Sequence, residues 1–202
     1  MSRARKKKLL AEAAAPEFLR ALRTFYHGRP GDLFTSARFY WPAGSGLRQS
    51  IATHFLAKRR PAGADSLVDT AAKVEVLLPA DVPEDYTDPD FLVASYMARL
   101  PVEETSAFAQ LTMSFPDATN LHGPWEAARS WLRDYYVERL GVPVVAILHA
   151  PFLAESASPV HLHALVLLRK ATAFGWLSTR RDLAGDSGLE AAAASWQAWP
   201  MR

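Results

Sequence analysis

The sequence predicts an α+β fold, a two-layer sandwich in which helices pack on a central antiparallel sheet. Three apolar, β-prone runs and one amphipathic helix in the second half of the chain carry this prediction. The runs span residues 105–115, 143–149 and 160–168, and the helix spans residues 124–140. The order strand, helix, strand, strand places the helix on one face of the sheet. The opposite face is then available for a site.

The remaining elements have weaker signals. Leucines and phenylalanines among alanines predict a helical segment over residues 9–27, which is interrupted by Pro16, a residue that can begin a second helix. The further expected elements are a strand over 33–41, a helix over 51–59, a strand over 73–78, a short helix over 90–100 and a terminal helix over 190–199. A linker from Pro61 divides the chain into an N-terminal part, 1–60, with a basic tail, and an α+β domain, 61–202. The two parts can also form one continuous domain.

Composition limits the classes of protein that fit. The chain has 202 residues, of which 50% are hydrophobic and 22% charged, as in an ordinary globular protein. Cysteine is absent, so a metal site has to be built from histidine and carboxylate ligands. No apolar stretch reaches the roughly 18 residues of a membrane helix, and the N-terminus lacks the pattern of a signal peptide. We therefore expect a cytoplasmic protein with no membrane partner.

Two of the β-prone runs carry histidines. His149 ends the run 143–149, while His161 and His163 lie near the start of the run 160–168. Residues i and i+2 of a strand point to the same face, so His161 and His163 project together. If the two runs pair as antiparallel neighbours, His149 lies beside them. Three neutral imidazoles on one face predict a site for a divalent metal ion.

A His-x-His pair alone is more typical of a hydrogen-bonded core or rim than of a metal site. The third histidine makes the metal site the favoured interpretation. The pattern does not fit histidine-triad hydrolases, two-histidine phosphoesterases or cupins, each of which needs ligands that this chain lacks. His27, His54 and His122 have no partner pattern and are expected on the surface or in loops.

Basic side chains form clusters that can contact phosphate groups. The formal net charge is only +2, so the clusters say more than the total. Each cluster taken alone is more typical of solvated surface charge. The candidate DNA-binding residues are Lys58, Arg59, Arg60, Arg169, Lys170, Arg180 and Arg181.

Landmark residues follow one another in a characteristic order over residues 108–181. They are Pro116 at the end of a strand, Gly141 after the long helix, His149 at the end of the next strand, the His161-Leu162-His163 strand, Arg169, and the turn Phe174-Gly175-Trp176. In this order and spacing the segment resembles the MobA/MobL group of plasmid mobilisation relaxases. These are HUH endonucleases, named for the His-hydrophobic-His motif.

The resemblance implies an enzyme that nicks single-stranded DNA at a plasmid origin of transfer during conjugation. It implies a Mg²⁺ or Mn²⁺ ion held by His149, His161 and His163. The ion polarises the scissile phosphate for in-line attack by a tyrosine hydroxyl. The products are a 5′-phosphotyrosine link and a free 3′ hydroxyl. Single-stranded DNA and other mobilisation proteins are the implied partners.

The nucleophile is the part of the family pattern that this chain matches least. The family places its tyrosine on an N-terminal helix after an alanine-rich stretch, which has no close counterpart here. Tyr40 is the first candidate and Tyr26 the second. Between Phe39 and Trp41, Tyr40 fits an aromatic packing anchor slightly better. The alternative to a nicking enzyme is therefore a catalytically degenerate HUH-like protein that binds DNA as an accessory or regulator.

Overall fold

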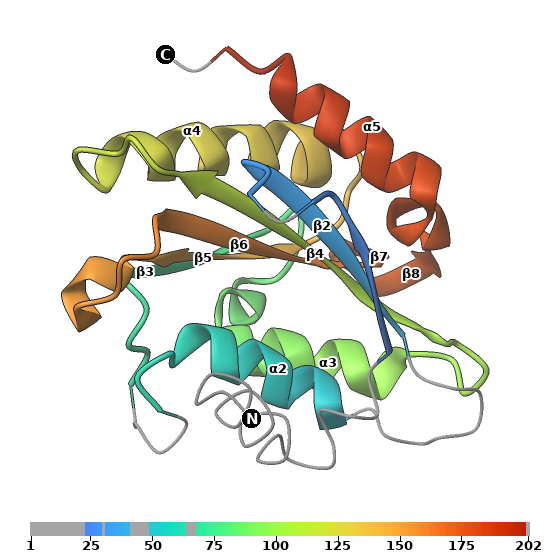
Figure 1. Cartoon of the computed structure of the whole chain (residues 1–202). Helices are drawn as coiled ribbons and strands as arrows, with labels where there is room; N and C mark the ends of the chain where they lie inside the picture. The colour runs from blue at the N-terminus through green and yellow to red at the C-terminus, as the bar shows by residue number, and fades with distance from the viewer. Residues whose placement is uncertain (1–22, 30, 41–48, 64–67, 201–202) are drawn as a thin grey trace, which may run out of the picture.

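A six-stranded antiparallel sheet runs through the protein, as a computed structural model shows (Figure 1). The structure describes residues 23–29, 31–40, 49–63 and 68–200, without the side chains of residues 23–27, 49 and 50. The strand order is β1-β2-β4-β6-β5-β3. The strands are β1 (Arg23–His27), β2 (Phe34–Tyr40), β3 (Lys73–Leu77), β4 (Ser106–Phe115), β5 (Val144–His149) and β6 (Val160–Leu167).

Helices cover both faces of this sheet (Figure 1). Helices α4 (His122–Leu132), which continues as a π-helical turn over Arg133–Glu138, and α5 (Asp186–Gln197) lie on one face. Helices α2 (Gln49–Arg59) and α3 (Pro89–Arg99) lie on the other. The α+β class with a central antiparallel sheet is confirmed, with three layers where two were expected. Within the described residues, no helix is long and apolar enough to cross a membrane.

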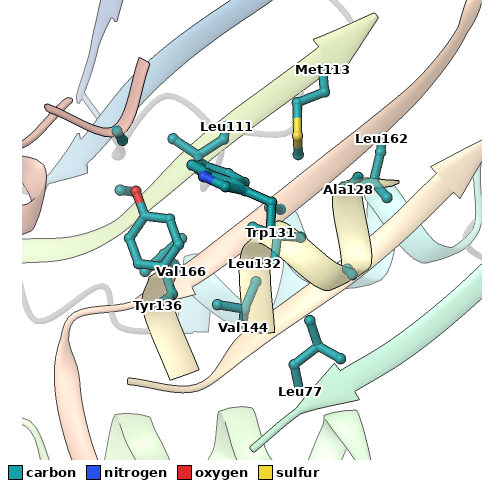
Figure 2. Close-up of a cluster of buried hydrophobic side chains, with 14 of the residues drawn as sticks. Leu77, Leu111, Met113, Ala128, Trp131, Leu132, Tyr136, Val144, Leu162 and Val166 are labelled. Carbon is teal, nitrogen blue, oxygen red and sulfur yellow. The ribbon is translucent and has the colours of Figure 1, made fainter. Parts of the chain in front are cut away.

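The central strands explain the third layer. Nearly every residue of β5 and β6 is buried, so both of their faces need cover. On the α4 face, Trp125, Ala128, Trp131 and Leu132 form an apolar stripe at helical spacing. This stripe packs on strand side chains that point the same way, as Figure 2 shows, among them Leu77, Leu111, Met113, Val144, Leu162 and Val166. The face toward α2 and α3 has a second apolar cluster, which includes Phe55, Leu92, Phe108, Ile147 and Leu165.

Smaller elements complete the chain. A separate hairpin of β7 (Arg169–Thr172) and β8 (Gly175–Thr179) follows the end of β6. Short 3-10 turns are η2 (Glu84–Thr87), η4 (Pro151–Ala154) in the loop between β5 and β6, and η5 (Arg181–Ala184) before α5.

The N-terminal helix prediction is wrong where it can be compared with the structure. Residues 9–22 lie outside the described part of the chain, but Arg23–His27 form β1, which pairs with β2 from Arg23↔Tyr40 to His27↔Ser36. Strand pairing here outweighs the helix-like local pattern. Strands β1 and β2 belong to the segment 1–60, and they join the same sheet as the strands of 61–202. The other predicted elements are confirmed within a few residues, α5 beginning at Asp186.

Candidate metal centre

Pairing of β5 with β6 brings the three histidines together. The register sets His149 opposite His161 and Ile147 opposite His163, so all three histidines point to the face covered by α2 and α3. The ring centroids are 5.0 Å apart for His149 and His161, and 4.9 Å apart for the other two pairs. The predicted antiparallel pairing and the shared face are confirmed.

Each of the three imidazoles has one nitrogen engaged by a neighbouring group. His149 Nε2 donates to the carbonyl oxygen of Lys58 at 2.7 Å, and His161 Nδ1 donates to that of Pro159 at 2.9 Å. His163 Nδ1 lies 3.0 Å from the Thr112 hydroxyl oxygen, to which it donates in the corresponding tautomer. These contacts leave His149 Nδ1, His161 Nε2 and His163 Nε2 as the atoms with a free lone pair.

The donor set fits a divalent ion. The three histidines offer one nitrogen each, and these atoms lie within 4.8 Å of one another. A metal-binding imidazole commonly donates its other N–H to an oxygen acceptor, which fixes the tautomer and the ring orientation. All three rings meet that condition. No carboxylate or thiol belongs to the cluster in the described part of the chain. The histidines can therefore hold a metal ion through nitrogen alone.

The surroundings keep two of the ligands in the form that binds metals. Burial lowers the pKa of His163 well below its ordinary value, with smaller contributions from the charges of Lys58 and the other histidines. Burial also lowers the pKa of His149, against the opposing effect of its bond to the Lys58 carbonyl. Both rings are therefore neutral near pH 7, and neutral imidazole is the ligand form.

Behind His163 lies a chain of polar groups that connects it to α2. Gln110 Nε2 is 3.5 Å from His163 Nδ1 and 3.5 Å from the Thr112 hydroxyl, and Gln110 Oε1 accepts from His54 Nε2 at 2.8 Å. The His54 ring also packs on Phe108, with ring centroids 5.0 Å apart. The expectation that His54 is a surface or loop residue is wrong, because α2 docks its ring against the sheet.

Burial of His54 should make the unfolding free energy depend on pH. Burial lowers its pKa to about 4, partly offset by the Gln110 bond, while the unfolded chain takes up the proton near 6.5. The contribution of neutral His54 to the unfolding free energy is fully present above pH 6.5. It is lost as the pH falls toward 4, by up to about 1.4 kcal/mol per pH unit. We expect His54→Gln to reduce this loss, as measured by urea unfolding of the metal-free protein between about pH 7 and pH 5. Equal pH dependence in the two proteins would contradict this assignment.

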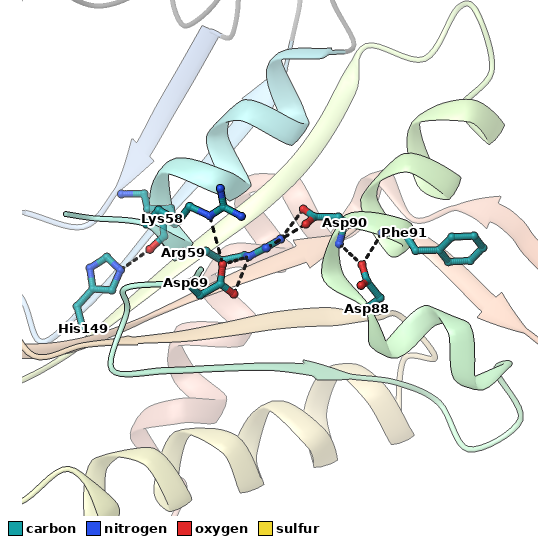
Figure 3. Close-up of polar contacts among 8 residues, drawn as sticks. Lys58, Arg59, Asp69, Asp88, Asp90, Phe91 and His149 are labelled. Atoms are coloured by element: carbon teal, nitrogen blue, oxygen red, sulfur yellow. Dashed lines mark hydrogen bonds and ion pairs between the residues drawn. The ribbon is translucent and has the colours of Figure 1, made fainter. Parts of the chain in front are cut away.

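Some of the predicted DNA-binding residues are paired with carboxylates in the structure, and others are not. Arg59 is buried, with Nε 3.0 Å from both Asp69 oxygens and Nη1 2.6 Å from Asp90 Oδ1 (Figure 3). Arg60 Nε lies 3.6 Å from Asp69. Sequence clusters do not reveal such partners, so Arg59 is left out of the proposed DNA surface. Lys58, in contrast, has no carboxylate partner among the described residues.

The C-terminal basic residues also make internal contacts. Arg169 donates to the carbonyl oxygens of Leu177 and Arg99. Arg180 pairs with Asp182 at 2.7 Å, and Arg181 pairs with the buried carboxylate of Glu104 at 3.0 Å. Lys170 lies half-buried in β7. All four follow the end of β6 that is far from His161, so the structure does not bring them to the histidine cluster.

The two candidate tyrosines occupy different positions in the sheet. Tyr40 pairs with Ser106 at the start of β4, whereas His163 pairs with Thr112, about 20 Å further along that strand. Tyr40 lines a hollow with Gly185, beside the N-terminus of α5. The structure therefore does not bring Tyr40 to the histidines.

Tyr26 lies in β1, and its side chain is outside the described part of the structure. Its register partner is Ala37, which pairs in turn with Gln110. By register, residue 26 is thus in line with the polar chain behind His163.

Comparison with known proteins bears on the fold. No protein-family model matches the chain, and no curated protein matches it. Among solved structures, the chain is similar to one from a study of the molecular basis of vancomycin resistance transfer in Staphylococcus aureus. The TM-score is 0.59 at 14% identity, over 87% of this chain and 88% of the other. This similarity shows a shared fold.

Proposed function

We propose that this protein is a relaxase-like DNA-binding protein that uses His149, His161 and His163 to hold a divalent metal ion, Mg²⁺ or Mn²⁺. In this proposal, it binds single-stranded DNA at a plasmid origin of transfer and nicks it through a tyrosine. The observation that carries the proposal is the arrangement of the three rings. Each has one nitrogen engaged and the other free, and one nitrogen from each ring lies within 4.8 Å of the others.

The charge of the occupied metal site would favour a phosphate ligand. The cluster contains no carboxylate among the described residues, so three neutral imidazoles leave the full charge of a bound cation uncompensated. A phosphodiester supplies the missing negative charge. When bound, the metal would polarise a phosphate oxygen and lower the cost of charge growth during displacement.

The chain's own residues would hold the three metal ligands in position. Thr112, Pro159 and the Lys58 carbonyl orient the three rings before any ligand arrives. In the nicking step, a tyrosine oxygen would give its proton to water and form a bond to phosphorus, while the bond from phosphorus to the 3′ oxygen breaks. That oxygen takes up a proton and becomes the free 3′ hydroxyl. Of the two candidates, the register of β1 favours Tyr26 over Tyr40.

The alternative is a DNA-binding accessory or regulator without nicking activity. The position of Tyr40 favours this alternative, because the leading candidate lies at the far end of β4 from the histidine pairing. Both versions retain the metal centre and the binding of single-stranded DNA. They differ only in the covalent step.

A covalent-adduct assay separates the two. The protein is incubated with Mn²⁺ and a pool of single-stranded oligonucleotides of randomised sequence, and adducts that survive denaturing electrophoresis are counted. We expect an adduct that chelation of the metal abolishes, that Tyr26→Phe abolishes and that Tyr40→Phe retains. An electrophoretic shift of the native protein with no adduct would support the accessory protein. Absence of both adduct and shift would contradict the proposed function.

A further inference from the structure

Lys58 connects helix α2 to the histidine cluster. Its carbonyl oxygen, in the last turn of α2, accepts from His149 Nε2 at 2.7 Å. Figure 3 shows its side chain on the His149 side of the helix, whereas the Arg59 side chain points away toward Asp90. The carbonyl and the side chain of Lys58 therefore both lie on the side of α2 that faces His149.

The Lys58 ammonium has no compensating charge. Among the described residues, no carboxylate forms an ion pair with Lys58, although its neighbour Arg59 has two carboxylate partners. The side chain is partly buried. A partly buried charge without a partner is costly. A cation bound by the adjacent histidines would repel the Lys58 ammonium. An anion bound between the two charges would be attracted by both.

We propose that Lys58 binds a non-bridging oxygen of a DNA backbone phosphate and positions that phosphodiester against the histidine cluster. This inference rests on the proposed function. A lysine ammonium binds phosphate as a compact charge with three donors, and it needs no planar geometry. One phosphate between Lys58 and a bound cation would compensate both. The same chemistry would also accept inorganic phosphate, which the experiment below distinguishes.

The test compares Lys58→Met with the wild-type protein in two measurements. The first is Mn²⁺ affinity by calorimetry without DNA. It should rise, because a repelling charge is removed. The second is affinity for a single-stranded oligonucleotide with Mn²⁺ at several salt concentrations. It should fall about ten-fold, and the slope of log affinity against log salt should shrink by about 0.7. Lys58→Arg should retain most of the DNA affinity.

Lys73→Met is the matched control. The Lys73 ammonium lies 5.2 Å from the Trp125 ring, on the α4 face of the sheet, and so is separated from the histidines. This variant should leave Mn²⁺ affinity and the salt slope unchanged. Inorganic phosphate is titrated in parallel against the Mn²⁺-loaded protein. If Lys58→Met weakened binding of inorganic phosphate but left oligonucleotide affinity unchanged, Lys58 would bind free phosphate. The proposal that it binds the DNA backbone would then be wrong.

Opposite changes in the two affinities are the signature of the proposed role. If Lys58→Met lowers both affinities together, Lys58 acts as a structural residue and the proposal is wrong. An unchanged salt slope in both Lys58→Met and a second variant, Lys58→Gln, would overturn it as well. If the wild-type protein binds neither Mn²⁺ nor the oligonucleotide, the proposed function itself fails.

Discussion

Replacing His163 with alanine should lower Mn²⁺ affinity by more than about 100-fold, since even the loss of an outer-shell partner costs 10–100-fold. His163 is the most buried of the three candidate ligands, at 7% exposed, and Thr112 fixes its ring. Its loss leaves two imidazoles and no nearby carboxylate to take its place. Affinity for single-stranded DNA in Mn²⁺ should then fall to the metal-free level. Calorimetry with Mn²⁺, followed by a DNA titration with and without the metal, measures both effects.

Two further variants make this prediction specific. His161→Ala removes a more accessible ligand and should have the same effect on Mn²⁺ affinity, with less risk to folding. His122→Ala removes an exposed histidine at the start of α4 and should leave Mn²⁺ affinity unchanged. If His163→Ala and His161→Ala, folded as judged by circular dichroism, bound Mn²⁺ as tightly as the His122→Ala protein, the histidine cluster would not be the metal site.

Replacing Arg59 with methionine should cost about 3 kcal/mol of unfolding free energy, because it leaves carboxylates without their buried partner. The Arg59 guanidinium joins the end of α2 to Asp69, ahead of β3, and to Asp90 in the first turn of α3 (Figure 3). Its hydrogen bond lowers the pKa of Asp90. The estimate is at the low end for a buried pair because the Asp90 side chain is 68% exposed and can be hydrated.

Arg59→Met should also weaken metal binding. The last turn of α2 presents the Lys58 carbonyl to His149, so a shifted helix end would release that ring. Urea unfolding and Mn²⁺ titration of the same preparation test the two effects. Arg139→Met is the control, since it removes an exposed pair with Asp134 and should change stability by less than about 1 kcal/mol. Equal stability of the two variants would show that the Arg59 contacts are not structural.

The metal cluster could be predicted from sequence because its geometry is local. His161 and His163 share a face through the two-residue period of a strand, and β5 and β6 are consecutive strands that pair directly. The supporting side chains Gln110 and Thr112 also left a signal. They are polar residues two apart in the middle of strand β4, among Phe108, Ala109, Leu111 and Met113, and they point to the histidine face.

Other parts of the site depend on contacts between distant segments. The His54–Gln110 bond spans 56 residues and the His149–Lys58 bond spans 91, and nothing in the sequence of α2 indicates where that helix docks. The basic pair Lys58-Arg59 shows the same limit. One side chain is buried between two carboxylates and its neighbour has none, although the sequence presents them as equivalent.

Crystals of the protein grown with Mn²⁺ test the metal centre most directly, through the anomalous scattering of the ion. We expect one anomalous peak on the α2 side of the sheet, just over 2 Å from each of His149 Nδ1, His161 Nε2 and His163 Nε2. The opposite nitrogens should keep their bonds to Lys58, Pro159 and Thr112. A crystal grown at a saturating Mn²⁺ concentration with no peak at the histidines would contradict the proposed metal centre. An ion bound through the opposite nitrogens would contradict it as well.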